Sequence, residues 1–398
     1  MKKIYSLFLV LSVILSMGYS KNFLSERFFE IQIGVPADFS NNAISLDDIF
    51  KKELTLDLAK IANEMPSEGL NLIVDAKPYV AINFNIAFIH IGMSAGVDVY
   101  EKMGISKDFF DFLGKGNEVG ETLTFDFNNY TDLFAFCEAD VGIDFSNLSI
   151  HVTPSLFVPI FSSSGSVAKV TFLNDEEGNI NLNMNTNFSV YSNFDMYDEN
   201  FLSDLFSNGN GFDVGVSASL PFGRKLVFSG KARIPIVPGS YQYKYSSYYE
   251  ATTTMNLLDS SLNSSETNGN IKDFSKEVLE EKIYINRPMK FNLYADYLLM
   301  GNVLKLRAGG GMGVFRPFLT DSFTYPEYYF SAGINLFDFI KASISTEYTN
   351  QIFKHQIALG INVRLIELDC GVSLQSTNFM KSFSNNGFGA YAIVSIGF

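Results

Sequence analysis

The chain has 398 residues and a formal net charge of −14, and 47% of its residues are hydrophobic, 15% aromatic and 18% charged. So acidic a chain lacks the basic footprint of nucleic-acid binding, and no nucleic-acid partner is expected. Adsorption to an anionic membrane surface is excluded on the same ground. Two cysteines, Cys137 and Cys370, are too few for a disulfide framework, and the sequence leaves open whether they pair.

The N-terminus has the three regions of a secretory signal peptide. A pair of lysines precedes an almost uninterrupted apolar run over 4–17, and the small residues Gly18 and Ser20 suit a cleavage site. We therefore assign 1–20 to a signal peptide and 21–398 to one exported domain. That domain holds no long uncharged apolar run, so helical membrane spans are not expected in it.

Alternating polar and apolar residues indicate strands in the exported domain. In "GNINLNMNTNFSVY" (178–191) asparagine takes every second place and apolar side chains take most of the others. A period of two indicates a β-strand, because successive side chains point to opposite faces. A soluble sandwich turns its apolar face inward, whereas an outer-membrane barrel turns it outward to lipid. In a barrel, Leu182 and Met184 would face lipid.

The C-terminus favours the barrel. The segment "FGAYAIVSIGF" (388–398) alternates back from an aromatic last residue, Phe398. Such an ending resembles the signal by which outer-membrane barrels are handed to their insertion machinery. The resemblance implies that machinery and outer-membrane lipid as partners, and an outer-membrane location.

The connections between predicted strands alternate between short and long, as the two ends of an outer-membrane barrel require. The stretch 240–283 is the longest polar segment and is predicted to be a long outer loop, whereas "NDEEG" (174–178) is predicted to be an inner turn. The short link at 349–352 is an exception to the alternation. We predict an all-β fold, a transmembrane antiparallel β-barrel of about 14–16 strands with short helices in its outer loops or mouth. The predicted strands are 29–35, 77–87, 91–101, 130–145, 148–160, 166–173, 179–191, 211–221, 225–238, 284–298, 302–315, 326–336, 338–349, 352–365, 367–376 and 386–398.

Two segments have helical rather than strand periodicity. Residues 45–64 place leucine, phenylalanine and isoleucine on one helical stripe, and Ser45 is the expected N-cap. A short helix is predicted over 106–113, capped by Ser106 and stopped by Gly114. The alternation of loops places both helices at the outer end, where they either plug the barrel mouth or cover their own loops.

No motif for catalysis or metal binding stands out. His90, His151 and His355 fall on three separate predicted hairpins without a short metal-ligand spacing, so no metal site is expected. No Ser–His or Asp–His constellation is placed by a motif, so the chain is not expected to be an enzyme or to hold a cofactor. The alternate glycines of "AGGGMG" (308–313) share the lumen face, which indicates either a snug interior or a gap in the wall.

The charged residues of the predicted strands fall on the face opposite the apolar one. Acidic residues dominate that face in the N-terminal half and basic residues in the C-terminal half, which either creates a field across a pore or plugs it with ion pairs. The candidate lumen-facing charges are Asp98, Glu138, Asp140, Asp144, Asp213, Lys231, Arg233, Lys290, Asp296, Lys305, Arg307, Glu347 and Lys354.

Three segments carry a family resemblance that covers the whole mature chain: "NAISLDDIFKKELTLDLAKIANEMPSEGL", "ISKDFFDFLGKGN" and "RPMKFNLYADY". With them the chain resembles a group of outer-membrane barrels of spirochaetes and Bacteroidetes, similar in build to the long-chain fatty-acid transporter family. The Asn-Pro-Ala motif of that transporter family does not occur between Ser20 and Phe29, and no ligand residue is carried over.

The sequence leads to two hypotheses of function. The first is an outer-membrane channel or transporter that passes small polar or hydrophobic solutes by passive diffusion, without a cofactor. The second is a surface-exposed structural or adhesin-like barrel, whose acidic outer loops at 192–210 and 240–283 bind partners outside the cell.

Overall fold

A computed structural model describes residues 27–45, 57–145, 148–163, 165–198, 209–223, 225–256, 266–300, 303–384 and 386–398. The signal peptide predicted at 1–20 lies outside the described residues. Within them, alternating sequence forms strands, and the strands join into one sheet. The strands are β1 (Phe29–Asn41), β2 (Leu70–Ala76), β3 (Tyr79–Ile86), β4 (Ile89–Ile105), β5 (Thr122–Phe145), β6 (Leu148–Ser163), β7 (Ser166–Asn174), β8 (Asn179–Ser192), β9 (Gly211–Phe222), β10 (Leu226–Val237), β11 (Gly239–Asn256), β12 (Glu266–Ile285), β13 (Met289–Leu299), β14 (Leu304–Phe315), β15 (Phe323–Leu336), β16 (Ile340–Thr349), β17 (Ile352–Asn362), β18 (Ile366–Ser376) and β19 (Gly387–Gly397).

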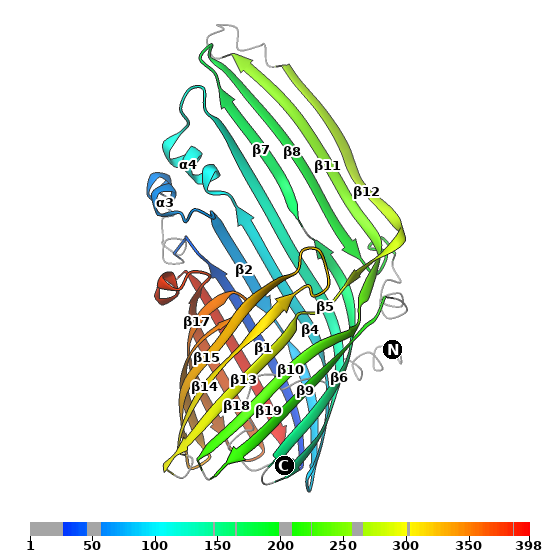
Figure 1. Ribbon diagram of the computed structural model, residues 1–398, viewed down its shortest axis with the longest axis vertical. Coiled ribbons are helices and arrows are strands. Elements are labelled where there is room, and N and C mark those ends of the chain that lie inside the picture. The colour runs from blue at the N-terminus through cyan, green and yellow to red at the C-terminus, as the bar shows by residue number, and fades with distance from the viewer. Residues whose placement is uncertain are drawn as a thin grey trace.

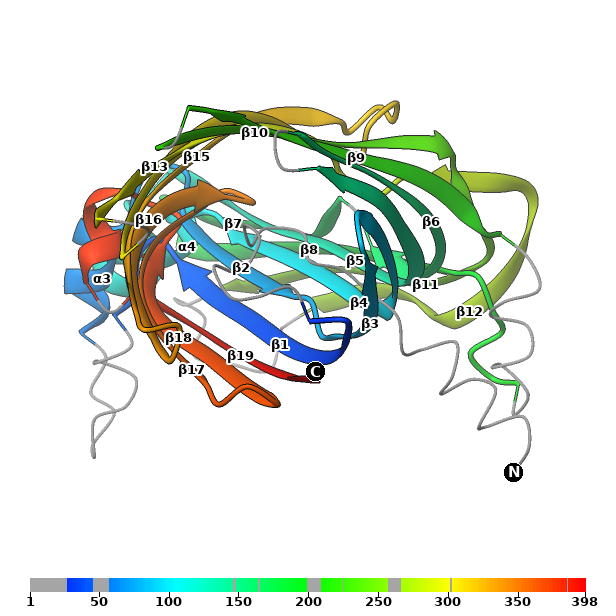
Figure 2. The same ribbon diagram turned by 90° about the horizontal axis from the view of Figure 1, so that it is seen from below.

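The sheet closes into a barrel, because β1 pairs with β19 along its length and with β2 and β3 on its other side. Every pairing is antiparallel, and the ring can be followed in Figures 1 and 2. Five of the nineteen described strands continue the preceding strand in the same direction, so the ring has fourteen positions. The continued pairs are β2/β3, β6/β7, β8/β9, β10/β11 and β12/β13. The predicted fold class, an all-β antiparallel barrel of about 14–16 strands, is confirmed.

The excess of the predicted strand number over fourteen has a simple cause. The sequence suggests a reversal between 148–160 and 166–173, but β7 continues β6 along the same partner, β5. Likewise β8 and β9 follow one another beside β6 instead of forming separate positions in the ring. A polar interruption therefore marks a break within a strand here, and not a turn between two strands.

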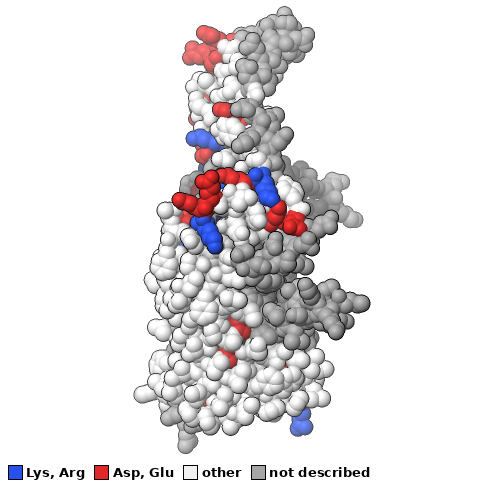
Figure 3. Space-filling model, turned by 90° about the vertical axis from the view of Figure 1, so that its right-hand side faces the viewer, with Lys and Arg blue, Asp and Glu red and all other residues white. Residues whose placement is uncertain are grey.

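The outer surface of the closed ring is apolar and its inner surface is polar. Along β17 the outward side chains of Ile357 and Leu359 are 66% and 47% exposed, whereas Ala358 is buried. The lower part of the view in Figure 3 carries few charged residues, which gather at mid-height and above. Charged side chains on a lipid-facing surface cost about 2–4 kcal/mol each at the bilayer midplane, so this distribution fits a transmembrane barrel.

The two ends of the barrel differ. One end, which we call the short-turn end, holds tight links such as 87–88 and 337–339 together with Phe29 and Phe398. The opposite, extended end carries the helices and a tall sheet of β7, β8, β11 and β12 that rises above the ring, and we call this sheet the wing (Figure 1). The turn at 174–178 lies at the tip of the β7–β8 hairpin, so its predicted place at the inner end is wrong.

The predicted outer loop at 240–283 is also wrong, because most of this segment forms the paired strands β11 and β12. Tyrosine and threonine, which recur through 239–256, favour strands even where both faces are polar. Within the described residues β12 pairs with β11 alone, so one edge of the wing is open. An open sheet edge is not tolerated in hydrocarbon, which places the wing outside the membrane. For the same reason Leu182 and Met184 of β8 do not face lipid, contrary to the prediction.

Two short α-helices pack together at the extended end. The helix α3 (Leu58–Glu64) begins after its N-cap Asp57, whose carboxylate accepts a hydrogen bond from the backbone of Lys60. It confirms the last part of the predicted 45–64 helix, while residues 46–56 lie outside the described residues. The helix α4 (Lys107–Lys115) follows Ser106 as predicted, but it ends at Gly116 and not at Gly114.

The position of Gly114 has a packing reason. A Cβ atom there would lie 2.4 Å from the backbone oxygen of Leu58, so glycine allows α4 to approach α3 closely. The two helices and a 3-10 helix, η2 (Met380–Phe383), cover connections at the extended end, and no residue of α3 or α4 lines the interior cavity described below. None of the described helices is both long and apolar enough to cross a membrane.

Candidate functional site

The barrel encloses a cavity of about 320 Å³, which we call the chamber. Strands β1, β2 and β4 form one side of it, and β10 and β13 to β17 form the rest. Its charged and tyrosine lining residues are Asp38, Asp75, Lys77, Asp98, Tyr100, Lys231, Arg233, Lys290, Tyr294, Arg307, Tyr325, Glu327, Tyr329, Glu347 and Lys354. A wall of this kind solvates polar and charged groups.

Most charges in the chamber are paired with a charge on another strand. The ion pairs are Lys77–Asp98 (3.5 Å), Lys290–Glu327 (2.8 Å), Lys354–Glu347 (3.6 Å) and Lys354–Asp38. Acidic and basic residues are thus interleaved around the wall. The predicted separation into an acidic wall and a basic wall is only partial, because Glu327 and Glu347 stand among the basic residues of the C-terminal half.

Arg233 and Lys231 are the basic residues of the chamber without an ion pair to any described residue. The corresponding acidic residue is Asp75, which accepts a hydrogen bond from Asn350. The Arg233 side chain lines the chamber although only 5% of the residue is exposed, and its Nε donates to the backbone oxygen of Pro288 at 3.2 Å. Its Nη1 has no hydrogen-bond partner among the described residues. Lys231, two residues earlier on β10, also lines the chamber and forms no ion pair with any described residue. The chamber therefore has excess positive charge at β10.

The thirteen charges predicted to face the lumen fall into four groups. Seven line the chamber: Asp98, Lys231, Arg233, Lys290, Arg307, Glu347 and Lys354. Asp296 and Lys305 pair with one another at 3.1 Å next to Arg307. Glu138 and Asp213 lie beside a buried arginine, and Asp140 and Asp144 lie beside a histidine.

The buried arginine is Arg287, between β12 and β13, and it joins walls that are far apart in the ring. Its side chain is 0% exposed. Its Nη2 lies 2.7 Å from Glu138 of β5, and its Nε lies 3.1 Å from Asp213 of β9. The guanidinium also lies over the ring of Phe136 at 4.7 Å. Because β5 and β13 are four positions apart in the ring, this contact spans the interior.

Arg316 makes a second crossing of the same kind. It lies in the connection from β14 to β15 and donates to both carboxylate oxygens of Asp132 on β5, at 3.0 and 2.7 Å. Its Nη1 binds Asp321 at 2.6 Å. Next to the two crossings, aromatic residues of β5 and β6 pack with Tyr241 and Ile285 into a buried cluster. This side of the interior is closed, and the chamber lies beside it.

Glycines on the inner face make room for tyrosine rings from the next strand. A Cβ atom at Gly309 would lie 2.3 Å from the ring of Tyr294, and one at Gly313 would lie 2.3 Å from the ring of Tyr325. Both tyrosines line the chamber. Of the two interpretations of the glycine-rich segment, the snug interior is therefore the one that the structure supports.

Sequence reasoning missed several residues of the interior. Asn350, in the short 349–352 link, has φ of +49° and turns into the chamber. Its amide oxygen accepts hydrogen bonds from Lys290 at 2.7 Å and Tyr325 at 3.1 Å, and its amide nitrogen donates to Asp75. The signal was present, because asparagine in a two-residue link is typical of a tight hairpin with positive φ.

A local sequence feature also marks the positions of Arg287 and Arg316. Each stands directly before a proline, which cannot donate to a strand ladder and so marks a break in it. At such a break a long side chain can leave the regular alternation and cross the interior. The two breaks touch, because the Asn286 amide donates to the backbone oxygen of Pro317 at 3.1 Å.

Two further groups concern the chemistry of the chain outside the chamber. The thiols of Cys137 on β5 and Cys370 on β18 are free.

On α4, burial tends to raise the pKa of Asp111, but hydrogen bonds from Lys107 and Lys115 lower it below its ordinary value of 3.8. The Asp111 carboxylate therefore pairs with both Lys107 and Lys115, each four residues away on the helix.

The strand pairing, the apolar exterior and the charged chamber define a transmembrane β-barrel with a polar interior. No family model matches the sequence, and no curated protein matches it either. Among solved structures, the Pseudomonas putida toluene transporter TodX is 7% identical, with 95% of this chain and 91% of that chain covered and a TM-score of 0.49.

The Ralstonia pickettii toluene transporter TbuX is 6% identical, with 94% of this chain and 90% of that chain covered and a TM-score of 0.43. The translocator domain of the autotransporter NalP from Neisseria meningitidis is 8% identical, with coverages of 95% and 91% and a TM-score of 0.33. At these TM-scores the likenesses carry no argument about function, and the barrel assignment rests on the strand pairing itself. The resemblance to barrels of spirochaetes and Bacteroidetes stays a prediction.

Proposed function

We propose that the protein is an outer-membrane channel or transporter that passes small polar solutes with an anionic group by passive diffusion. A closed barrel with an apolar exterior provides the membrane-spanning wall, and the chamber provides a polar site within it.

The observation that carries the solute class is the unpartnered edge of Arg233. A buried guanidinium nitrogen without a partner is costly, and a solute carboxylate or phosphate would satisfy it with a charge-assisted hydrogen bond. Lys231 adds a second positive charge on the same strand. The acidic residues of the opposite wall, such as Asp75 and Asp98, would orient an amino group on the same solute.

The sequence admitted both polar and hydrophobic solutes, and the chamber favours the polar ones. An apolar molecule inside it would strip water from charged side chains without replacing their hydrogen bonds. A zwitterion or an anion would instead find groups of opposite charge within the wall. We therefore expect amino acids and small organic acids to pass faster than neutral sugars of similar size, and fatty acids to pass slowly.

Liposome swelling with purified, folded protein tests this proposal. The variant Arg233→Gln keeps hydrogen-bonding capacity but loses the charge. It should reduce the preference for anionic solutes at least about tenfold, since such a bond contributes about 1.5–3 kcal/mol. The matched control is Arg364→Gln, an exposed arginine in a turn at the short-turn end. Swelling that is absent for every solute, or a preference that Arg233→Gln leaves unchanged, would overturn the proposal.

The wing favours a second role, adhesion at the cell surface. It projects beyond the membrane, and it exposes Glu277, Glu280 and Glu281 of β12 together with Lys276 and Lys282. We would expect a shortened β11–β12 hairpin to lose binding to immobilised basic proteins while solute flux is preserved. If flux falls and no binding is ever detected, the wing serves the barrel and this second role is dismissed.

A further inference from the structure

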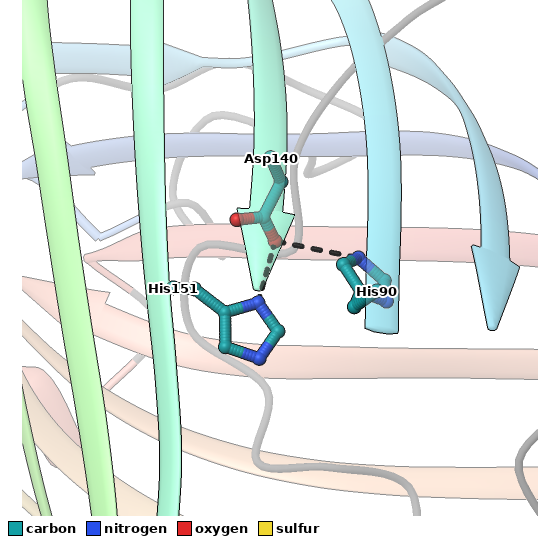
Figure 4. A group of neighbouring side chains, drawn as sticks. All are labelled: His90, Asp140 and His151. Carbon is teal, nitrogen blue, oxygen red and sulfur yellow. Dashed lines mark hydrogen bonds and ion pairs between the residues drawn. The ribbon is translucent and has the colours of Figure 1, made fainter. Parts of the chain in front are cut away.

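Three side chains from three adjacent strands converge in the interior near the short-turn end: His90 of β4, Asp140 of β5 and His151 of β6 (Figure 4). The His90 Nε2 atom lies 3.4 Å from Asp140 Oδ2, and the His151 Nδ1 atom lies 3.1 Å from the same oxygen. The three candidate ligand atoms all lie within 4.8 Å of one another. The group is separate from the chamber, since none of the three lines it.

Each of the three side chains is held by a further partner on its other polar atom. The Nδ1 atom of His90 lies 2.7 Å from the amide oxygen of Asn85, and the Nε2 atom of His151 lies 3.3 Å from Asp144 Oδ1. The remaining oxygen of Asp140 accepts a hydrogen bond from the Thr153 hydroxyl at 3.2 Å. Outer partners of this kind fix the orientation of histidine and carboxylate ligands in metal sites.

These partners bear on which ring nitrogens carry hydrogen. A neutral His90 donates from Nδ1 to the Asn85 oxygen and has its Nε2 lone pair toward Asp140. A neutral His151 has its Nδ1 lone pair there when its Nε2 donates to Asp144 or to the Ser149 oxygen at 3.1 Å. Two lone pairs then face one carboxylate oxygen. This arrangement is unfavourable without a cation among the three atoms, so the site calls for a metal ion or for added protons.

Two glycines give the histidine rings the space that this arrangement needs. A Cβ atom at Gly142 would lie 2.4 Å from the His151 ring, and one at Gly92 would lie 3.0 Å from His90 Nε2. Both positions are glycine, so the two rings can lie against the neighbouring strands with their nitrogens turned to Asp140.

We propose that His90, Asp140 and His151 bind a divalent transition metal, with Zn²⁺ as the expected ion. Nitrogen and carboxylate ligands about 2.0–2.2 Å from a tetrahedral ion lie about 3.4 Å apart, close to the two nitrogen–oxygen separations seen here. Two imidazoles and one carboxylate are a ligand set that zinc accepts, with a fourth position left for water or for an atom of a solute. The ion would tie β4, β5 and β6 together near the short-turn end. Sequence spacing could not indicate it, because each ligand is on a different strand.

Metal titration of tag-free protein, folded in detergent and stripped with chelator, tests the proposal. Calorimetry with Zn²⁺ and the visible absorption of bound Co²⁺ should both give one ion per chain. His90→Gln and His151→Gln should each weaken binding at least about tenfold, as losses even of outer partners do. The matched control is His355→Gln on β17, a histidine that contacts Thr346 and Ser382 instead and should leave binding unchanged.

Circular dichroism and the heat-dependent gel mobility of folded barrels establish that each variant has assembled. A wild-type chain that binds no ion stoichiometrically at neutral pH would overturn the proposal and leave protons as the cations of the site. Binding that survives in the His90→Gln/His151→Gln double variant would overturn it as well. Solute flux is not part of this readout, so the outcome is independent of the proposed channel function.

Discussion

The arginine that crosses the barrel interior offers the sharpest test of how this fold is stabilised. Arg287 is fully buried, and its guanidinium lies 2.7 Å from Glu138 and 3.1 Å from Asp213. Replacing it in Arg287→Met keeps much of the volume but removes the charge. Two carboxylates are then left inside the protein without their cation.

The expected cost follows from that arrangement. Removing one partner of a buried ion pair destabilises a protein by about 3–5 kcal/mol, because the remaining charge stays uncompensated. Arg287 has two such partners and also lies over Phe136, so we expect about 4–5 kcal/mol. Neutralising the carboxylates as well, in Arg287→Met/Glu138→Gln/Asp213→Asn, should recover most of the loss, since the penalty arises from buried charge.

Urea unfolding in lipid vesicles measures both values. The chain has no tryptophan, so far-UV circular dichroism is the suitable signal. Arg364→Gln, an exposed substitution at the short-turn end, is the control and should change the unfolding free energy by less than about 0.5 kcal/mol. A loss below about 1 kcal/mol for Arg287→Met, or a triple variant no more stable than the single one, would refute the reasoning.

Two other predictions concern packing and pH. Gly309→Val places a branched side chain against the ring of Tyr294 and should cost about 1–3 kcal/mol in the same unfolding assay, whereas a neutral effect would show that the ring moves aside freely. The pKa of Asp111 is lower in the folded protein than its ordinary 3.8, so its bonds to Lys107 and Lys115 stabilise α4 above that pH and are lost as the pH falls through the lowered pKa. The protection of α4 amides from hydrogen exchange, relative to their intrinsic rates, should therefore fall below about pH 4 in the wild type. Asp111→Asn should remove this dependence, and equal protection profiles for both chains would contradict it.

An interruption of the polar–apolar alternation can mark either a turn between two strands or a break within one strand. The local sequence pattern could not distinguish the two. At 174–178 and 349–352 the chain reverses, whereas β7 continues in the direction of β6 and β13 in the direction of β12. Turn residues occur in both cases. The difference depends on which strand lies alongside, and that is a contact between residues distant in sequence.

The inner face of the barrel could be predicted in part. Charged residues opposite an apolar face had to point inward, because lipid excludes them from the outside. Their partners could not be predicted, because register across the ring decides that Lys290 meets Glu327 and that Arg287 reaches Glu138. The same holds for His90 and His151, which are 61 residues apart in the chain and share one carboxylate only because β4, β5 and β6 are adjacent.

The sequence by itself determined that this chain is a barrel with apolar side chains outside and polar side chains inside. The period of two and the absence of long apolar runs after residue 20 are local properties, and local chemistry suffices to dictate them. Tertiary structure alone decided that the ring has fourteen positions, that the wing rises above it, and that Arg233 is left without a full set of partners in the chamber. Each of these features depends on how the sheet closes. Closure depends on the register of every strand pair and on which strands continue one another, and those are contacts between residues distant in sequence.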